Sequence, residues 1–300
     1  MSPAGVSIDS VLPVAHSDPA YRPAEHVPMK ASQAIQGTVG RSTPRVTLVE
    51  ATRVPVTVVI PTLNEAPRLR ATLSELCWAD EVIVVDGGST DGTATIARST
   101  GARVLTVPGP TIGAQRNAGS AAARNQWVLA LDADEQVTPE LRESLARLSS
   151  SPRPGHVAYR VRSRNWHLGQ EMRHGPWAHD WKVRVFTRDQ RFTNDRVHER
   201  LADVETVGAL DGTLLHHPYR DLAHQIDKIV KYAQWAAADL RARGRRTHVS
   251  DLMVRPAWRF GRDYVLMGGW RDGTAGLITA GVSAFSVFLK YACLLTNPPA

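Results

Sequence analysis

Residues 54–61 read Val-Pro-Val-Thr-Val-Val-Ile-Pro, a continuous run dominated by β-branched side chains. Such a run predicts a strand buried on both faces, because a half-exposed strand alternates apolar and polar residues. Similar runs follow at residues 81–86, 102–107 and 127–132. The segments between them are predicted to be helical: residues 64–77, 93–99 and 113–124. Strands and helices that alternate at this spacing predict a mostly parallel central sheet flanked by crossover helices.

The remaining chain divides by composition. Residues 1–53 are rich in Pro, Ser, Ala and Thr and are expected to form a flexible tail without a secretory signal. Residues 54–250 are expected to form one α/β domain. Its second half is expected to hold a helix and two strands: residues 139–148, 156–165 and 181–187. Residues 251–300, which follow a predicted helix over 222–242, are expected to be a helical extension.

Composition narrows the class of partner. The 300 residues are 43% hydrophobic and 22% charged, which is typical of a globular protein. The formal net charge of +7 favours an anionic partner such as a nucleic acid, a sugar nucleotide or an acidic membrane surface. Cys77 and Cys293 offer no disulfide framework and no metal cluster, so a cytoplasmic location is expected.

Polar residues stand where three of the predicted strands end. Asn64 follows the first strand, Asp86 closes the second, and Asp132-Ala133-Asp134 closes the fourth. In a parallel sheet, ligands bind beyond the carboxyl ends of the strands. Alternate residues of a strand share a face, so Asp132 and Asp134 would project together and suit Mg²⁺ or Mn²⁺. An ordinary strand-to-turn junction is the simpler reading of the same pair.

The loop after Asp86, Gly-Gly-Ser-Thr-Asp-Gly, permits tight turns and close approach of a ligand. It is neither the Gly-rich fingerprint of dinucleotide binders nor a P-loop, so those two classes are disfavoured. The segments 58–65 (VVIPTLNE), 84–93 (VVDGGSTDGT) and 131–135 (LDADE) resemble the family-2 inverting glycosyltransferases in order and spacing. The resemblance covers about residues 54–217 and implies the GT-A fold, with a nucleotide half at about 54–135 and an acceptor half at about 136–220.

The resemblance also implies roles for individual residues. A nucleotide-sugar donor, most simply a UDP-sugar, would be bound by Pro61, Thr62, Asn64, Glu65, Asp86, Gly113, Gln115, Arg116 and Asp132. Within this set Asp86 would accept a hydrogen bond from the base, and Arg116 would meet the diphosphate. The metal would be held by Asp134 and Asp132, with His216 or His217 as a late histidine able to reach it.

The catalytic base has two candidates. Inversion requires a carboxylate that takes a proton from the acceptor hydroxyl. Asp180 matches the family position best, although His179-Asp180 replaces the more usual Glu-Asp pair, and Glu199 is the rival. Either acid could instead pair with one of the nearby arginines. Trp177 and Trp181 flank Asp180 and are candidates to stack on an acceptor sugar, while burial in the core is the alternative for each.

The C-terminal region predicts contact with a membrane. Residues 253–264 interleave Trp, Phe and Tyr with Arg, which is typical of a helix at a lipid interface. Residues 277–295 are apolar but contain Lys290, so a buried helix and a membrane helix both remain open. No recognition motif supports a nucleic-acid partner.

Segments 174–186 and 197–199 and the C-terminal pattern resemble the bacterial subgroup with lipopolysaccharide inner-core β-glucosyltransferases. We therefore expect a metal-dependent transferase at the inner face of the cytoplasmic membrane, acting on a hydroxyl of an envelope glycan or lipid-linked acceptor. Transfer to polyprenyl phosphate and non-catalytic binding of a sugar nucleotide or glycan are the alternatives.

Overall fold

The computed structural model describes residues 53–109, 111–151, 155–178, 180–193, 200–202, 204 and 206–296. These residues belong to the second of two units into which the chain divides, Glu50–Ala300. The expected N-terminal tail therefore lies outside the described residues, except for Arg53.

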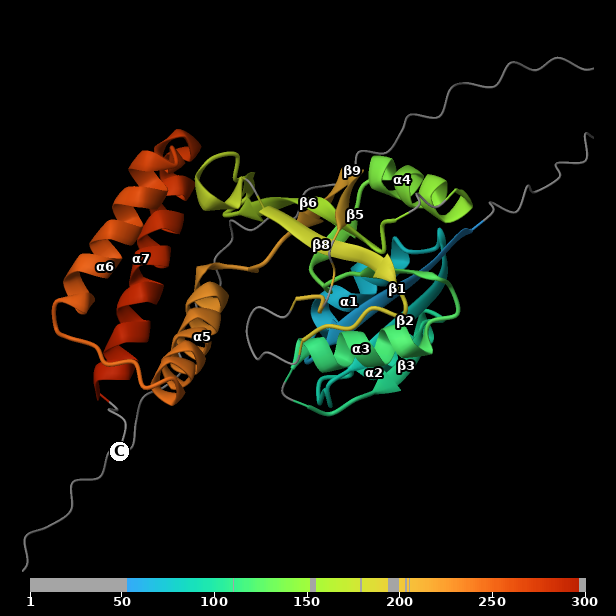
Figure 1. The fold of residues 1–300 in the computed structure, drawn as a ribbon, viewed down its shortest axis with the longest axis horizontal. Helices are drawn as coiled ribbons and strands as arrows, with labels where there is room; N and C mark the ends of the chain where they lie inside the picture. The colour runs from blue at the N-terminus through green and yellow to red at the C-terminus, as the bar shows by residue number, and fades with distance from the viewer. Residues whose placement is uncertain are drawn as a thin grey trace, which may run out of the picture. The chain divides into compact units, whose positions relative to one another are not determined.

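A single sheet joins the strands (Figure 1). They are β1 (Val54–Thr62), β2 (Ala79–Asp86), β3 (Arg103–Thr106), β4 (Trp127–Ala130), β5 (Glu135–Val137), β6 (Ala158–His167), β7 (Gln170–Glu171), β8 (Asp180–Thr187) and β9 (Val207–His216). Their order across the sheet is β3-β2-β1-β4-β8-β6-β9-β5, and β7 pairs only with the end of β6. The first four positions in this order are parallel, as the strand and helix alternation predicts.

Beyond β4 the sheet becomes mixed. β8 runs antiparallel to both β4 and β6, and β5 runs antiparallel to β9, whereas β6 and β9 are parallel. The expectation of a mostly parallel sheet thus describes the nucleotide half and not the acceptor half. The sequence analysis also did not identify β9, because its sequence (Val-Gly-Ala-Leu-Asp-Gly-Thr-Leu-Leu-His) shows no sustained alternation of apolar and polar residues.

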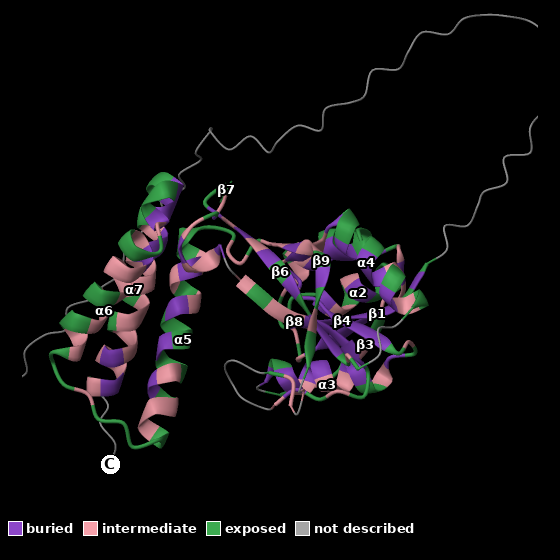
Figure 2. Cartoon of the chain, turned by 45° about the horizontal axis from the view of Figure 1, so that its top comes forward, coloured by how far each residue is buried: buried purple, intermediate pink, exposed green. Residues whose placement is uncertain are grey.

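The helices are α1 (Ala66–Ser74), α2 (Thr93–Ser99), α3 (Ile112–Ala122), α4 (Pro139–Ser150), α5 (Leu222–Ala242), α6 (Asp251–Gly261) and α7 (Gly273–Thr296). Alternate residues of β1 face opposite layers. Val58 packs in one apolar cluster with Leu69 of α1 and Leu141 of α4, whereas Val59 packs in another beside α3. The central strands are therefore buried on both faces (Figure 2).

The C-terminal part is a helical unit in which α7 packs against both α5 and α6. A π-helical turn, η2 (Arg262–Leu266), and a 3₁₀ turn, η3 (Gly269–Asp272), connect α6 to α7. No residue of α6 is buried, and Figure 2 shows this helix in the colours of exposed and half-buried residues. The mixed α/β fold with a helical C-terminal part agrees with the fold predicted from the sequence.

The contact of α3 with the sheet depends on Gly119. A Cβ atom at this position would come within 2.3 Å of Val59 Cγ1 and 3.0 Å of Val85 Cγ2. We expect Gly119→Val to lower the free energy of unfolding by about 2–3 kcal/mol, because overpacking outweighs the gain in helix propensity. Urea denaturation measures this change. Ala121→Val, at an exposed position of the same helix, is the control and should cost less than ~1 kcal/mol; equal losses for the two variants would contradict the close contact.

Candidate functional site

The carboxyl ends of β1, β2 and β4 lie at one edge of the sheet. Thr62 pairs with Asp86 in register, and the N–H of Leu131 donates to the carbonyl of Val59, so Asp132 follows directly on β4. A cavity of about 460 Å³ opens there. Its wall includes seven of the residues predicted to bind donor or metal: Pro61, Thr62, Glu65, Gln115, Asp132, Asp134 and His216. Asn64, Asp86, Gly113 and Arg116 are not part of that wall.

The loops after β1 and β2 are joined by side chains. Asn64 adopts a left-handed backbone (φ 58°), and its Oδ1 accepts from the N–H of Thr90 at 2.9 Å. Ser89 Oγ accepts from the N–H of Asn64, and Asp91 accepts from the N–H of Ala66. Asn64 thus fixes the shape of the loop after β1, whose residues Leu63 and Glu65 line the cavity.

Asp86 is buried, and its carboxylate is hydrogen-bonded within its own loop. Its carboxylate accepts hydrogen bonds from the N–H and the hydroxyl of Ser89. The neighbouring Gly87 leaves space for Gln115, because a Cβ atom there would lie 2.4 Å from Gln115 Nε2. The side chain of Gln115 therefore lies over the end of β2. A hydrogen bond from Asp86 to a nucleobase stays a prediction.

Asp132 is the centre of an ion-pair cluster. Its carboxylate contacts Arg116 Nη2 at 2.8 Å and Arg184 Nη2 at 2.5 Å, and Arg184 also contacts Glu135 Oε1 at 2.7 Å. Arg116, Arg184 and Glu135 are all buried. Burial alone raises the pKa of Asp132, yet Arg184 and Arg116 outweigh it and hold that pKa far below its usual range. Asp132 is therefore an anion that pairs with both arginines, and Glu135 supplies the second negative charge of the cluster.

Asp134 lies in a different environment. Arg68 Nη1 approaches its Oδ2 at 3.1 Å, and the carboxylate is largely buried. Burial, with the nearby charges of Asp132 and Glu135, raises the pKa of Asp134 to about 7. The two acids of the pair thus differ in protonation although one residue separates them.

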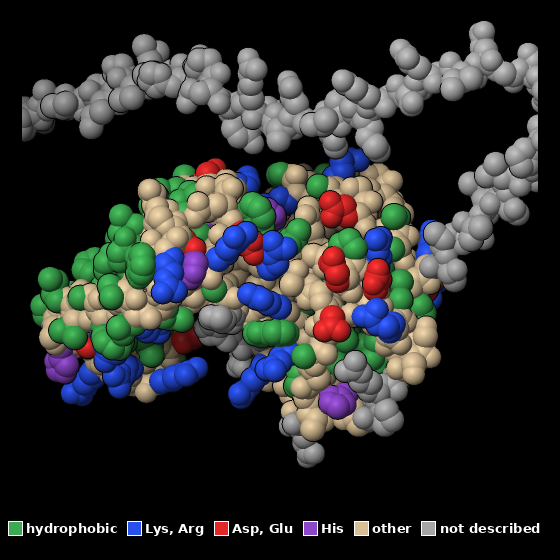
Figure 3. Space-filling view, turned by 90° about the horizontal axis from the view of Figure 1, so that it is seen from above, with side chains coloured by type: hydrophobic (Ala, Val, Ile, Leu, Met, Phe, Trp, Pro, Cys, Tyr) green, Lys and Arg blue, Asp and Glu red, His purple; other side chains and the backbone are tan. Residues whose placement is uncertain are grey.

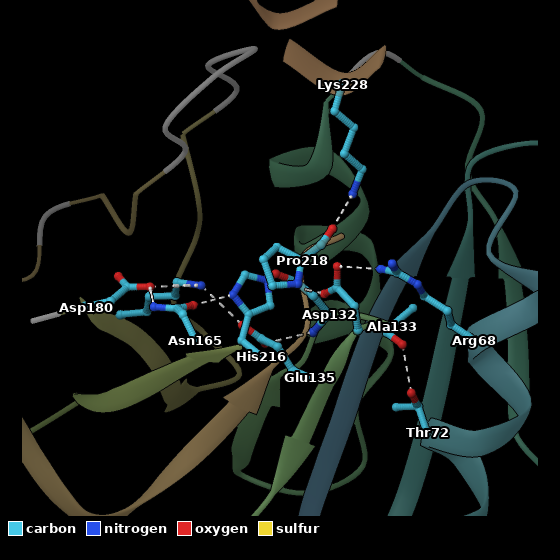
Figure 4. A network of polar contacts seen from close by, with 12 residues as sticks. Arg68, Thr72, Asp132, Ala133, Glu135, Asn165, Asp180, His216, Pro218 and Lys228 are labelled. Atoms are coloured by element: carbon cyan, nitrogen blue, oxygen red, sulfur yellow. Dashed lines mark hydrogen bonds and ion pairs between the residues drawn. The ribbon is translucent and has the colours of Figure 1, made fainter. Parts of the chain in front are cut away.

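His216 faces Asp134, and Asn165 orients it. Asn165 Nδ2 donates to the carbonyl of Trp177 at 2.9 Å, so Asn165 Oδ1 is the acceptor for His216 Nδ1 at 2.7 Å (Figure 4). Burial, followed by the charge of Lys182, lowers the pKa of His216 to about 4. The ring is therefore neutral with its proton on Nδ1, and the lone pair on Nε2 lies 3.5 Å from Asp134 Oδ1.

These donors fit a divalent ion. Two neighbouring ligands with bonds of about 2.1 Å are expected about 3 Å apart, close to the Asp134–His216 separation. Within the part of the chain that the structure describes, no group of three His, Cys, Asp or Glu side chains could hold an ion alone. Two protein ligands supplemented by substrate phosphates are typical of Mg²⁺ sites. Of the acidic pair, Asp134 is the better placed ligand, because Arg116 and Arg184 occupy Asp132.

Asp180, the first residue of β8, connects to the same cluster. Its Oδ2 lies 3.3 Å from Asn165 Nδ2 and 3.4 Å from Lys182 Nζ. Asn165 thus bridges the proposed base and the proposed metal ligand His216, as Figure 4 shows. The rival, Glu199, lies outside the described residues. The assignment of the base stays a prediction.

The two tryptophans lie on opposite sides of β8. Trp177 belongs to the turn η1 (Gly175–Trp177), packs edge-on to His167 and carries the carbonyl bound by Asn165. Trp181 is exposed and stacks with the guanidinium of Arg160, on the face opposite Asp180. Only Trp177 therefore adjoins the proposed base.

Sequence analysis missed several residues of the site, namely Arg68, Glu135, Asn165, Arg184 and Lys228. The sequence pattern of β8 could have indicated Arg184, because Asp180, Lys182 and Arg184 share a face in any strand over 180–187. Asn165 carried no such signal, because one neutral amide is unremarkable in a sequence.

Comparisons with known proteins identify the family of the domain. Residues 57–203 match the family described as Glycosyl transferase family 2. The lipopolysaccharide core biosynthesis glycosyltransferase LpsC of Rhizobium meliloti (strain 1021) is 29% identical over 248 residues, 80% of this chain and 92% of LpsC. An uncharacterized glycosyltransferase of Rickettsia prowazekii is 27% identical over 261 residues, covering 80% of this chain and 86% of that protein.

Among solved structures, glucosyl-3-phosphoglycerate synthase from Mycobacterium tuberculosis superposes loosely, with a TM-score of 0.43 and 21% identity. That match covers 64% of this chain and 81% of the synthase. The assignment rests on the sequence matches, and the family match includes Asp132 and Asp134. The chain is a glycosyltransferase that carries a family 2 domain over residues 57–203.

Proposed function

We propose that the protein transfers a sugar, with inversion, from a nucleotide donor to a hydroxyl of an envelope glycan or lipid-linked acceptor. The observation that carries the proposal is the cavity at the strand ends, where Asp134 and His216 face each other beside two buried arginines. A UDP-sugar is the donor that the sequence resemblance implies. The similarity to LpsC, named for lipopolysaccharide core biosynthesis, supports an envelope acceptor.

Cationic side chains surround the place of the leaving diphosphate. Arg68 contacts Asp134, Arg116 lies behind Asp132, and Lys228 of α5 reaches the cavity wall. Mg²⁺ or Mn²⁺ held by Asp134 and His216 would add positive charge where the diphosphate becomes more negative. Arg116 is already fixed by Asp132 and Phe192, so it need not reorganise when charge develops.

Asp180 is proposed to take the proton of the acceptor hydroxyl. Its carboxylate is partly exposed, and Asn165 and Lys182 hold its Oδ2, which leaves Oδ1 for an acceptor. Trp177, whose turn is linked to Asn165, would position the acceptor sugar beside it.

The C-terminal helices are proposed to lie on a lipid surface. In α6 the cationic side turns inward: Arg255 pairs with Asp251 and lies over Tyr291, and Arg259 pairs with Asp263. The apolar side turns outward and leaves large side chains exposed: Met253, Val254 and Trp258 in α6, followed by Val265 and Leu266 in η2. This is the reverse of a helix on a soluble domain, which buries its apolar stripe.

Hydrophobic side chains gather over these helices in Figure 3, with Lys and Arg side chains near them. One helix of the described residues, Gly269–Thr296, is long and apolar enough to cross a membrane. We favour a peripheral attachment at the inner face of the cytoplasmic membrane, because α7 packs against α5 and α6 along its length.

The donor site predicts a pH-dependent metal affinity. A proton on Asp134 competes with the ion below a pKa of about 7, whereas His216 is neutral above about pH 4. The affinity of the UDP complex for Mn²⁺ should therefore rise about tenfold per pH unit below pH 7 and level off above it. Calorimetry with UDP and Mn²⁺ between pH 5.5 and 8.5 measures this. Asp134→Asn should abolish the effect of Mn²⁺ on UDP binding. A wild-type affinity for Mn²⁺ that does not change with pH would contradict the metal site.

The base is tested by Asp180→Asn. Transfer to a hydroxyl should fall by about 10²–10⁴-fold in kcat, while UDP affinity stays unchanged. The assay is UDP release from UDP-sugars with a host lipid extract as acceptor. Asp189→Asn, an exposed acid after β8, is the matched control. Activity that survives in Asp180→Asn would favour either Glu199, tested by Glu199→Gln, or a phosphate acceptor, which needs no base.

Membrane attachment is tested by placing charge on the outward side of α6. Trp258→Glu should weaken binding to vesicles of phosphatidylcholine and phosphatidylglycerol by about 10–100-fold, because a large apolar side chain leaves the lipid. Co-sedimentation measures the bound fraction. Val207→Glu, at an exposed apolar position at the start of β9, should leave it unchanged. Equal binding of wild type and Trp258→Glu would exclude this surface.

A further inference from the structure

One face of helix α5 turns toward the donor cavity. Lys228, Tyr232 and Trp235 all line that cavity. Their spacing of four and then three residues places them on one face of the helix. Helix α5 also packs against α7. The residues that α5 buries lie on a different face: Gln225, Ile229, Ala233 and Ala237. The helix therefore packs into the structure with one face and contributes another face to the cavity.

The chemistry changes along this cavity face of α5. Lys228 lies at the end near the proposed metal site: its Nζ donates to the carbonyl of Pro218 at 3.3 Å, beside His216 (Figure 4). Tyr232 and Trp235 follow about one and two turns later, about 6 and 10 Å along the helix axis. The face thus leads from a cation beside the metal site to two aromatic rings farther along the cavity.

The two rings stay exposed although they line a cavity. Each side chain is 46% exposed, and the rings contact each other edge-on with their centroids 5.6 Å apart. The same cavity is lined by Leu63, just after β1, and Ile112, at the start of α3, and both are exposed. Large apolar side chains that remain exposed around one cavity indicate a ligand that covers them.

The order of these groups matches a nucleoside diphosphate, which carries phosphates at one end and a flat aromatic base at the other. With its phosphates beside Lys228 and the metal ligands, such a ligand would direct its base toward Tyr232 and Trp235. Bases stack well on aromatic side chains. An acceptor sugar fits this position less well, because Trp177 and Asp180, on the acceptor side, do not belong to the described wall of this cavity.

The residue that the sequence predicted to contact the base is a weak anchor by itself. Asp86 is 4% exposed and does not belong to the described wall of the cavity. Its carboxylate already accepts hydrogen bonds from the N–H and the hydroxyl of Ser89. A base in the cavity therefore needs further contacts, and the exposed rings of α5 can supply them.

We propose that Tyr232 and Trp235 form a second wall of the nucleotide site and stack on the base of the donor, while Leu63 and Ile112 contact it from the side of the sheet. The inference rests on the proposed function and deepens it. It assigns part of donor binding to α5, which lies outside the family 2 match over residues 57–203.

The test is calorimetry of the full chain with two ligands that share a diphosphate: UDP and inorganic pyrophosphate, each with Mn²⁺. Trp235→Ala should weaken UDP binding about tenfold or more, because stacking on the base is lost, and should leave pyrophosphate binding unchanged. Tyr232→Ala should act in the same way. Trp235→Phe keeps an aromatic ring and should remain within about threefold of the wild type. Trp270→Ala, at an exposed position of η3, is the control and should change neither ligand.

Fluorescence separates stacking from an indirect structural effect. Of the eight tryptophans, Trp235 is the one in the described wall of this cavity. A base stacked on its indole should quench the emission when UDP is added. Trp235→Phe should remove most of that quenching although it still binds UDP.

Equal weakening of UDP and pyrophosphate by Trp235→Ala would indicate a structural role for the side chain. Unchanged UDP binding in both alanine variants would assign the rings to the acceptor or to lipid. Either result would overturn the inference, while binding of UDP with metal by the wild type would still support the proposed function. A wild type that does not bind UDP with Mn²⁺ would instead overturn the proposed function and this inference with it.

Discussion

The buried guanidinium of Arg184 joins the two halves of the sheet. It extends from β8 to Asp132 after β4 and to Glu135 in β5, and it is 4% exposed. Removing one partner of such a cluster leaves an uncompensated charge and typically costs ~3–5 kcal/mol. The two acids of Asp132-Ala133-Asp134 therefore differ in their surroundings. Asp132 is held in the buried ion-pair cluster, whereas Asp134 lines the cavity and is the proposed metal ligand.

The difference between Asp132 and Asp134 follows from the electrostatic field inside the ion-pair cluster. Asp132 between Arg184 and Arg116 stays ionised, and its negative charge, after burial itself, raises the pKa of Asp134. A neutral His216 opposite Asp134 then offers a lone pair instead of a competing positive charge. A divalent ion entering here would oppose the burial and the repulsion that together raise the pKa of Asp134. The same arrangement disfavours two neighbouring carboxylates without a metal. It favours a metal that is bound together with a substrate phosphate.

Periodicity explains what could be predicted. The β-branched run of β1 predicts a strand because both faces of that strand are buried. The carboxyl ends of parallel strands must lie at one edge of the sheet, so the position of the site could also be predicted. The positions of Asp132, Asp134 and His216 around one cavity agree with that reading. The acceptor half was harder, since its strands pair across long sequence separations. Asn165 meets His216 from 51 residues away, and nothing local in the sequence indicates that contact.

The acceptor side depends on the C-terminal helices for its shape. His174, just before η1, donates from its N–H to Asp272 Oδ2 at 2.8 Å, and the N–H of Gly175 donates to the carbonyl of Met267. His167, in the strand that carries Ser163 and Asn165, bonds to Thr279 of α7. These contacts tie strand β6 and the turn η1 to helices that direct apolar side chains outward. An acceptor whose lipid end rests in a membrane would then meet Trp177 at a height fixed by the same helices. The inward-facing arginines of α6 are understandable on this basis. The ion pairs of Arg255 with Asp251 and of Arg259 with Asp263 stabilise the segment that positions Trp177.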